Sequence, residues 1–141
     1  MIRTRRHSKK RNAMLTLIRS TRTHPGARWV YDQLKAELPG ISMATVYRNI
    51  GVLLEEGDLA SLGIINGEAR FDGNTGPHPH FVCIRCGLVA DLPGDPEPLA
   101  GPSGHDFTID YRRTVYYGLC GPCTRETPAY AGSNINFRSV L

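Results

Sequence analysis

The sequence predicts an α+β protein built from two small domains. Three segments with helical spacing of apolar residues precede a strong β-hairpin signal, and this order is the plan of a winged-helix domain. Beyond a Gly- and Pro-rich stretch, two Cys-x-x-Cys pairs flank short strand-like runs. We therefore expect a winged-helix domain at 1–73, a hinge at 74–78 and a small α/β domain at 79–141, which a four-cysteine zinc site holds together and which ends in a polar tail.

The three N-terminal segments have the apolar spacing of amphipathic helices. The first spans 9–18, and Ser8 is suited to cap its N-terminus. The second spans 27–38 and ends before a Pro-Gly pair, because proline cannot continue a helix. The third follows Ser42 as its N-cap and runs to about Glu56.

Strands are expected in both halves of the chain. The runs 59–65 and 68–72 are joined by Asn-Gly, which favours a type I′ hairpin turn. In the second half, 80–91 contains two short strand-like runs, and 107–117 alternates and is rich in Tyr, Val and Thr, so we expect one or two strands there. Between them, 92–104 holds four Pro and three Gly, which excludes an ordinary helix.

The charge of the chain is unevenly placed. The net charge is +4, yet no acidic residue precedes Asp32. Basic side chains crowd the start, which favours contact with a polyanion such as DNA, whereas the alternative is a solvated tail. The candidate contact residues in this stretch are Arg6, Lys9, Lys10 and Arg11.

We expect a cytoplasmic protein. No apolar run approaches the length of a membrane span, and the basic start is not followed by the apolar stretch of a secretory signal. Stable disulfides are uncommon in a reducing compartment, so the four cysteines need another role.

The cysteines are spaced as two pairs, Cys83 with Cys86 and Cys120 with Cys123. Each Cys-x-x-Cys turn brings two thiolates to one side, and two such pairs complete a closed tetrahedral site for structural Zn²⁺. A closed site of four cysteines has no open position for catalysis, so its role is to hold a small domain together. The alternative is a dithiol redox site, which needs only one pair.

A second group of candidate ligands crowds beside the first cysteine pair. His78 and His80 form a His-x-His motif, with Asp72 upstream and Asp91 downstream. Imidazole and carboxylate together suit ions such as Fe²⁺, Mn²⁺ or Zn²⁺. Each residue alone is more often an ordinary polar surface group, and it is their crowding that indicates a metal site.

The third predicted helix has the side chains of a major-groove reader. We expect Ser42, Thr45, Arg48 and Asn49 on its exposed face, where they can reach base edges and phosphates. Tyr47 either packs inside or touches a phosphate. The alternative is an ordinary solvated helix face.

Together these residues resemble the ferric uptake regulator family, over about residues 6–123. The match is closest to the peroxide-sensing PerR branch. The motifs that carry it are His24-Pro25-x-Ala27-x-x-Val30-Tyr31, Ile41-Ser42-x-Ala44-Thr45-Val46-Tyr47-Arg48-Asn49-Ile50, Ala69-Arg70-Phe71-Asp72, His78-x-His80-Phe81-x-Cys83-x-x-Cys86-Gly87-x-x-x-Asp91 and Tyr117-Gly118-x-Cys120-x-x-Cys123.

The resemblance implies a metal-dependent repressor that acts as a homodimer on palindromic operators in double-stranded DNA, with the second domain serving dimerisation. It also implies a regulatory Fe²⁺ or Mn²⁺ held by His24, Asp72, His78, His80 and Asp91. Peroxide reacting at bound Fe²⁺ would oxidise His24 or His78, and the repressor would then leave DNA.

Other functions are compatible with parts of this pattern. Within the family, the alternative is an iron- or zinc-uptake regulator. Outside it, the alternative is a zinc-ribbon module that binds a protein partner or RNA. We do not expect an enzyme, because no nucleophile has a matched base. Apart from metal ions and peroxide, no small-molecule substrate is expected.

Overall fold

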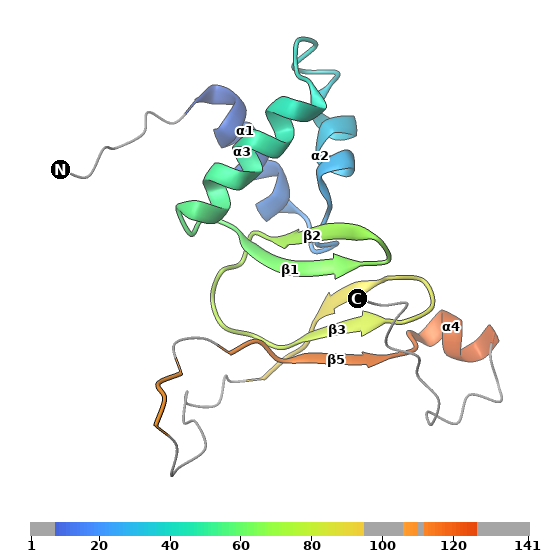
Figure 1. Ribbon diagram of the computed structural model, residues 1–141. Coiled ribbons are helices and arrows are strands. Elements are labelled where there is room, and N and C mark those ends of the chain that lie inside the picture. The colour runs from blue at the N-terminus through green and yellow to red at the C-terminus, as the bar shows by residue number, and fades with distance from the viewer. Residues whose placement is uncertain (1–7, 95–105, 110–111, 127–141) are drawn as a thin grey trace. The chain divides into compact units, whose positions relative to one another are not determined.

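The computed structural model describes residues 8–94, 106–109 and 112–126 and divides into two compact units (Figure 1). Unit 1 holds the described residues up to 75, and unit 2 holds those from 76. Expectations for Arg6, for most of 92–104 and for the tail beyond 126 lie outside the described residues. The elements are α1 (Lys9–Ser20), α2 (Ala27–Leu34), α3 (Met43–Glu55), β1 (Ala60–Ile65), β2 (Glu68–Asp72), β3 (His80–Cys83), β4 (Val89–Asp91), β5 (Val115–Gly118) and α4 (Gly121–Glu126).

The helices α1 and α3 begin where their predicted N-caps lie. The Ser8 hydroxyl accepts the Arg11 N–H at 3.2 Å, and the Ser42 hydroxyl accepts the Thr45 N–H at 3.1 Å. Each bond satisfies one of the amides that a helix start leaves without an intrahelical partner. Both predicted caps are confirmed.

The helix α2 is shorter than predicted, because it ends at Leu34 rather than at Leu38. The amides of Glu37 and Leu38 both donate to the Leu34 carbonyl, at 3.1 and 2.8 Å, so the chain closes in one tight turn. Pro39 follows, and its ring disfavours a helical conformation of the residue before it.

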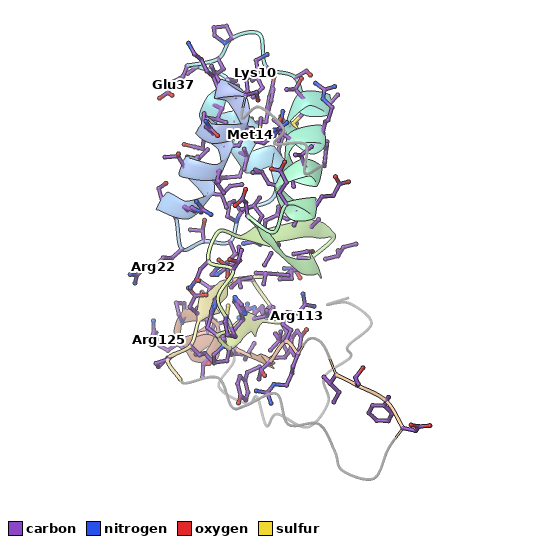
Figure 2. All side chains as sticks on the ribbon, turned by 90° about the vertical axis from the view of Figure 1, so that its left-hand side faces the viewer. Lys10, Met14, Arg22, Glu37, Arg113 and Arg125 are labelled. Atoms are coloured by element: carbon purple, nitrogen blue, oxygen red, sulfur yellow. The ribbon has the colours of Figure 1, made fainter. Side chains whose placement is uncertain are left out.

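The core of unit 1 is formed by the apolar faces of its three helices and by residues of the hairpin. Met14, Val30, Val46 and Leu53 are completely buried, and Met14 lies among the helices in Figure 2. The whole cluster of buried residues comprises Met14, Ile18, Ala27, Val30, Leu34, Ile41, Val46, Ile50, Leu53, Leu59 and Phe71.

The hairpin β1–β2 completes the winged-helix plan. The strands are antiparallel, and Asn66 and Gly67 between them have φ values of 51° and 77°. Positive φ at both central residues is the signature of the type I′ turn that the Asn-Gly pair predicts. The turn pairs Ile65 with Glu68, and a register shift between Ser61 and Gly63 then sets Asp72, at the end of β2, opposite Ala60.

Unit 2 is built on a three-stranded sheet of order β4-β3-β5. Antiparallel pairing of β3 with β4 sets His80 opposite Asp91, whereas β5 pairs parallel to β3. The prediction of strand over 107–117 is wrong at 107–109 and 112–114, which belong to no strand, whereas 110–111 lie outside the described residues. Since β3 has only four residues, β5 finds partners only along Val115–Gly118.

Few of the described apolar side chains of unit 2 are buried. Among its described residues, the buried ones that are apolar or sulfur-containing are Val82, Cys83, Val89 and Cys123. A domain with so small a core needs an additional link to fold. None of the described helices in either unit is long and apolar enough to cross a membrane.

Candidate metal centres and the exposed face of the third helix

The four cysteines lie together in unit 2. Their sulfur atoms are all within 4.8 Å of one another, and those of Cys86 and Cys120 are 3.7 Å apart. A tetrahedral ion with metal–sulfur bonds near 2.3 Å holds its sulfurs about 3.8 Å apart. The cluster therefore has the dimensions of a closed four-sulfur metal site.

Local backbone geometry builds this cluster. Gly87 has φ 75°, and its N–H donates to the Cys83 carbonyl at 3.0 Å, so the chain reverses just after Cys86. The Cys120 N–H donates to the Cys83 sulfur at 3.4 Å, and Cys123 lies in α4 directly beyond. The helix α4 was not predicted, because a six-residue segment shows too little apolar periodicity to reveal a helix.

The pKa values of Cys83, Cys86 and Cys123 are shifted in different directions. Burial raises the pKa of Cys83, but N–H donors from Cys86, Cys120 and Arg85 outweigh it and lower that pKa from 9.0 to about 6. The Cys120 side chain and burial raise the pKa of Cys123 to about 12. The Leu88 N–H lowers the pKa of Cys86, but the Cys83 side chain and burial outweigh it, so that the pKa is raised above its usual value of 9.0. Four thiolates so close together require a cation.

A second cluster in unit 2 consists of His78, His80 and Asp91. Oδ1 of Asp91 lies 3.0 Å from Nε2 of His78 and 3.4 Å from Nε2 of His80. Nδ1 of His78 is 2.7 Å from the Gly76 carbonyl, which can only accept, so Nδ1 carries a proton. In neutral His78, the Nε2 lone pair therefore faces a carboxylate oxygen, and a proton or metal cation is needed between them.

These distances fit a first-row metal ion. With nitrogen and oxygen ligands at about 2.1 Å, neighbouring donors are about 3.0–3.4 Å apart. The hydrogen bond from His78 to Gly76 also orients the ring through Nδ1 and leaves Nε2 directed to Asp91, an arrangement that is common among histidines that bind metals.

Unit 1 holds the other two predicted ligands, His24 and Asp72. Both are buried, and Nε2 of His24 lies 3.5 Å from Oδ2 of Asp72. The other carboxylate oxygen, Oδ1, accepts the Asn74 N–H at 2.8 Å, which orients the group. The five predicted ligands thus form two groups, two residues in unit 1 and three in unit 2.

The helix α3 exposes part of the predicted DNA-contact set. Ser42, Tyr47 and Arg48 are exposed, and the Tyr47 side chain is 60% accessible, which excludes packing inside unit 1. Thr45 is half-buried, and its hydroxyl lies 2.9 Å from that of Ser42. On α1, Lys9 and Lys10 are exposed.

The prediction of an exposed Asn49 is wrong, and Arg11, which was predicted to contact DNA, is not at the surface either, since both residues are buried. Asn49 lies between Val46 and Ile50 on the packed face of α3. Its Oδ1 accepts Arg11 Nε at 3.3 Å, and its Nδ2 donates to the Thr45 carbonyl at 2.8 Å. These two residues therefore bridge α1 and α3, a pairing that helical periodicity alone does not reveal.

We predict that Asn49→Ala lowers the free energy of unfolding of unit 1 by about 1–3 kcal/mol. The change removes an acceptor from a buried guanidinium whose Nη1 has no hydrogen-bond partner among the described residues. Urea unfolding followed by circular dichroism measures the effect, with Asn12→Ala on the exposed face of α1 as the control. Equal stability of the two variants would refute the bridge.

The fold and these clusters define a metal-binding winged-helix protein. The model of the ferric uptake regulator family matches residues 3–96, and the chain belongs to this family of metal-responsive transcriptional regulators. Among curated relatives, the peroxide-responsive repressor PerR of Staphylococcus aureus is 35% identical over 118 residues, which cover 81% of this chain and 79% of that protein.

Solved structures share the fold. The Helicobacter pylori ferric uptake regulator Fur matches with a TM-score of 0.68 at 17% identity, over 84% of this chain and 82% of that one. The Campylobacter jejuni peroxide stress regulator matches with a TM-score of 0.64 at 24% identity, over 81% of this chain and 88% of that one. The predicted α+β architecture and the predicted family are confirmed.

Proposed function

We propose that this protein is a metal-dependent transcriptional repressor that responds to peroxide. The observation that carries the proposal is the division of a histidine and aspartate donor set between the two units. One ion that took ligands from both groups would fix the pose of the winged helix relative to the rest of the protein. The relative from Staphylococcus aureus, itself a peroxide-responsive repressor, supports this assignment.

We assign Zn²⁺ to the four cysteines and Fe²⁺ or Mn²⁺ to the second set. Four thiolates suit zinc, whereas imidazole and carboxylate groups suit the harder ions. The second set comprises His24, Asp72, His78, His80 and Asp91. Asp72 and His78 are six positions apart, and a fully extended chain of that length spans about 20 Å, so the linker allows both groups to meet one ion.

Metal binding would act as the switch. An ion with ligands in both units shifts the population towards the pose that it stabilises. A change from mostly open to mostly closed requires about 5 kcal/mol of differential affinity, which a five-ligand chelate can supply. Bound Fe²⁺ also supplies the chemistry of peroxide reduction. One oxygen of the peroxide would enter the ring of His24 or His78 while the other leaves as water, and the oxidised ring would no longer hold the ion between the two units.

Operator binding would use the exposed face of α3. Tyr47 and Arg48 offer an aromatic ring and a guanidinium to the major groove, with Ser42 and Thr45 at the helix start. Lys9 and Lys10, which are exposed on α1, would contact phosphates, together with Arg6 shortly before them in the sequence.

We propose that the repressor acts as a homodimer on a palindromic operator. In the described part of unit 2, β5 lies at the edge of its sheet, where a second copy of the chain can add a strand. Two copies related by a twofold axis would present two α3 helices to successive major grooves.

Peroxide treatment of the metal-loaded protein tests the function. Intact-mass analysis of the Fe²⁺ form is expected to show a gain of one oxygen, about 16 Da. Peptide mapping is expected to locate this oxygen on a peptide with His24 or His78. The Mn²⁺ form is expected to show no gain, because Mn²⁺ binds without this chemistry. Equal masses before and after peroxide in the Fe²⁺ form would remove peroxide sensing and leave an iron- or zinc-uptake regulator.

Zinc binding is expected to release protons in a pH-dependent number. At pH 7.5 at least two protons should leave, because raised pKa values keep Cys86 and Cys123 protonated in the metal-free form. In the metal-free form at pH 7.5, Cys83 is already a thiolate because its pKa is about 6, and it gains a proton only when the pH falls through that value. Calorimetry in buffers of different ionisation enthalpy should therefore detect about one further proton at pH 5, and an unchanged number would contradict this titration.

A further inference from the structure

The backbone that carries His24 adopts an unusual conformation. His24 has φ 52°, in the left-handed region that a residue with a side chain rarely enters. It lies in the loop between α1 and α2, and it is only 3% exposed. Such a conformation persists where the surrounding structure holds it in place.

Arg70 on β2 holds this loop. Its Nε donates to the His24 carbonyl, and its Nη2 donates to the Thr23 carbonyl at 2.7 Å. The next residue along the strand, Phe71, donates its N–H to the Pro25 carbonyl at 3.1 Å. Three successive carbonyls of the loop are therefore bound by two neighbouring residues of β2.

The same strand carries the second ligand of unit 1. Alternate residues of a strand point to the same face, so Arg70 and Asp72 share a face of β2. Arg70 binds the main chain of His24, while Asp72 faces the imidazole ring, with Oδ2 at 3.5 Å from Nε2. The backbone and the imidazole ring of His24 are thus both contacted by residues of β2.

We propose that Arg70 is a positioning residue for the regulatory metal: its guanidinium holds His24 in the left-handed conformation that directs the imidazole to Asp72. The inference rests on the proposed function, since it assumes that His24 is a ligand. The planar fork of arginine donates to two carbonyls at once, whereas a lysine ammonium is a single point of charge. Lysine is therefore expected to replace it only in part.

Manganese affinity of the zinc-loaded full-length protein tests the proposal, with free Mn²⁺ measured by electron paramagnetic resonance. Arg70→Ala is expected to lower the affinity about 10- to 100-fold, the range for residues that orient metal ligands. Arg22→Ala is the matched control, because it removes a guanidinium from the same loop, where the exposed Arg22 points away from unit 1 (Figure 2). Wild-type affinity in Arg70→Ala would overturn the proposal.

A double-mutant cycle separates positioning from general destabilisation. In a His24→Ala background, Arg70→Ala is expected to cause no further loss of affinity, since its effect passes through His24. A loss that adds to that of His24→Ala would overturn the positioning role. If Arg70→Ala does not fold, Arg70→Lys decides: a lowered affinity supports the proposal and wild-type affinity overturns it.

The same variants separate this inference from the proposed function. Wild-type affinity in His24→Ala would remove His24 from the ligand set, and both proposals would fall. A loss in His24→Ala together with wild-type affinity in Arg70→Ala would leave the ligand set intact and overturn the role of Arg70 alone.

Discussion

Replacing Cys83 with serine is expected to abolish zinc binding and to unfold unit 2. Cys83 is completely buried at the end of β3, and the Cys120 N–H donates to its sulfur. A serine hydroxyl does not ionise in the neutral range, so the variant loses one thiolate ligand. Structural zinc contributes about 10–16 kcal/mol of apparent binding free energy to small domains that fold around it.

The small described core of unit 2 makes this effect large. Its described buried residues include only two aliphatic side chains, Val82 and Val89, which stabilise a domain by a few kcal/mol at most. The free energy lost with the zinc therefore exceeds the free energy that these two side chains contribute, and unit 2 unfolds. Zinc content by mass spectrometry and amide hydrogen exchange in β3 measure the result.

Arg85→Ala is the control for Cys83→Ser. Arg85 lies between the two cysteines of the first pair, and its side chain forms an exposed ion pair with Glu126 at 3.1 Å. Its backbone N–H, which helps to lower the pKa of Cys83, remains in the variant. Exposed ion pairs contribute about 0–1 kcal/mol, so this variant should keep its zinc. A Cys83→Ser protein with full zinc content and native exchange rates would contradict the account.

Replacing His24 with alanine is expected to lower the Mn²⁺ affinity about 100-fold or more and to abolish Mn²⁺-dependent operator binding. The change removes one of the five proposed donors and leaves the buried carboxylate of Asp72 without the imidazole that it faces at 3.5 Å. This loss of Mn²⁺ affinity is expected only if the metal site includes a ligand from unit 1. Zinc content should stay at the wild-type value, because the cysteines lie in unit 2.

His105→Ala serves as the matched control for His24→Ala, because it removes a histidine outside the proposed ligand set. Fluorescence anisotropy of a labelled operator with and without Mn²⁺ measures binding of both variants. Metal-dependent binding by His24→Ala at wild-type strength would exclude a regulatory role for this residue.

Local signals in the sequence were sufficient for much of the fold. Ser8 and Ser42 cap helices, and Asn66-Gly67 forms the hairpin turn, because each depends on a few neighbouring residues. The cysteine pairs were equally readable, since metal ligation restricts their spacing.

Several errors arose where distant residues decide the structure. Asn49 looked like a surface residue until Arg11, 38 positions earlier, proved to be its buried partner. The length of β5 is set by β3, which lies more than thirty residues upstream. Arg70 belonged to a recognisable motif, but its bonds to the carbonyls of Thr23 and His24 depend on tertiary structure.

A crystal structure of the full-length protein loaded with zinc and Mn²⁺ tests the central claim most directly. We predict one Mn²⁺ with Nε2 of His24 at about 2.2 Å, together with ligands from both units. A Mn²⁺ bound only by His78, His80 and Asp91, with the imidazole of His24 directed to solvent, would contradict the proposed clamp.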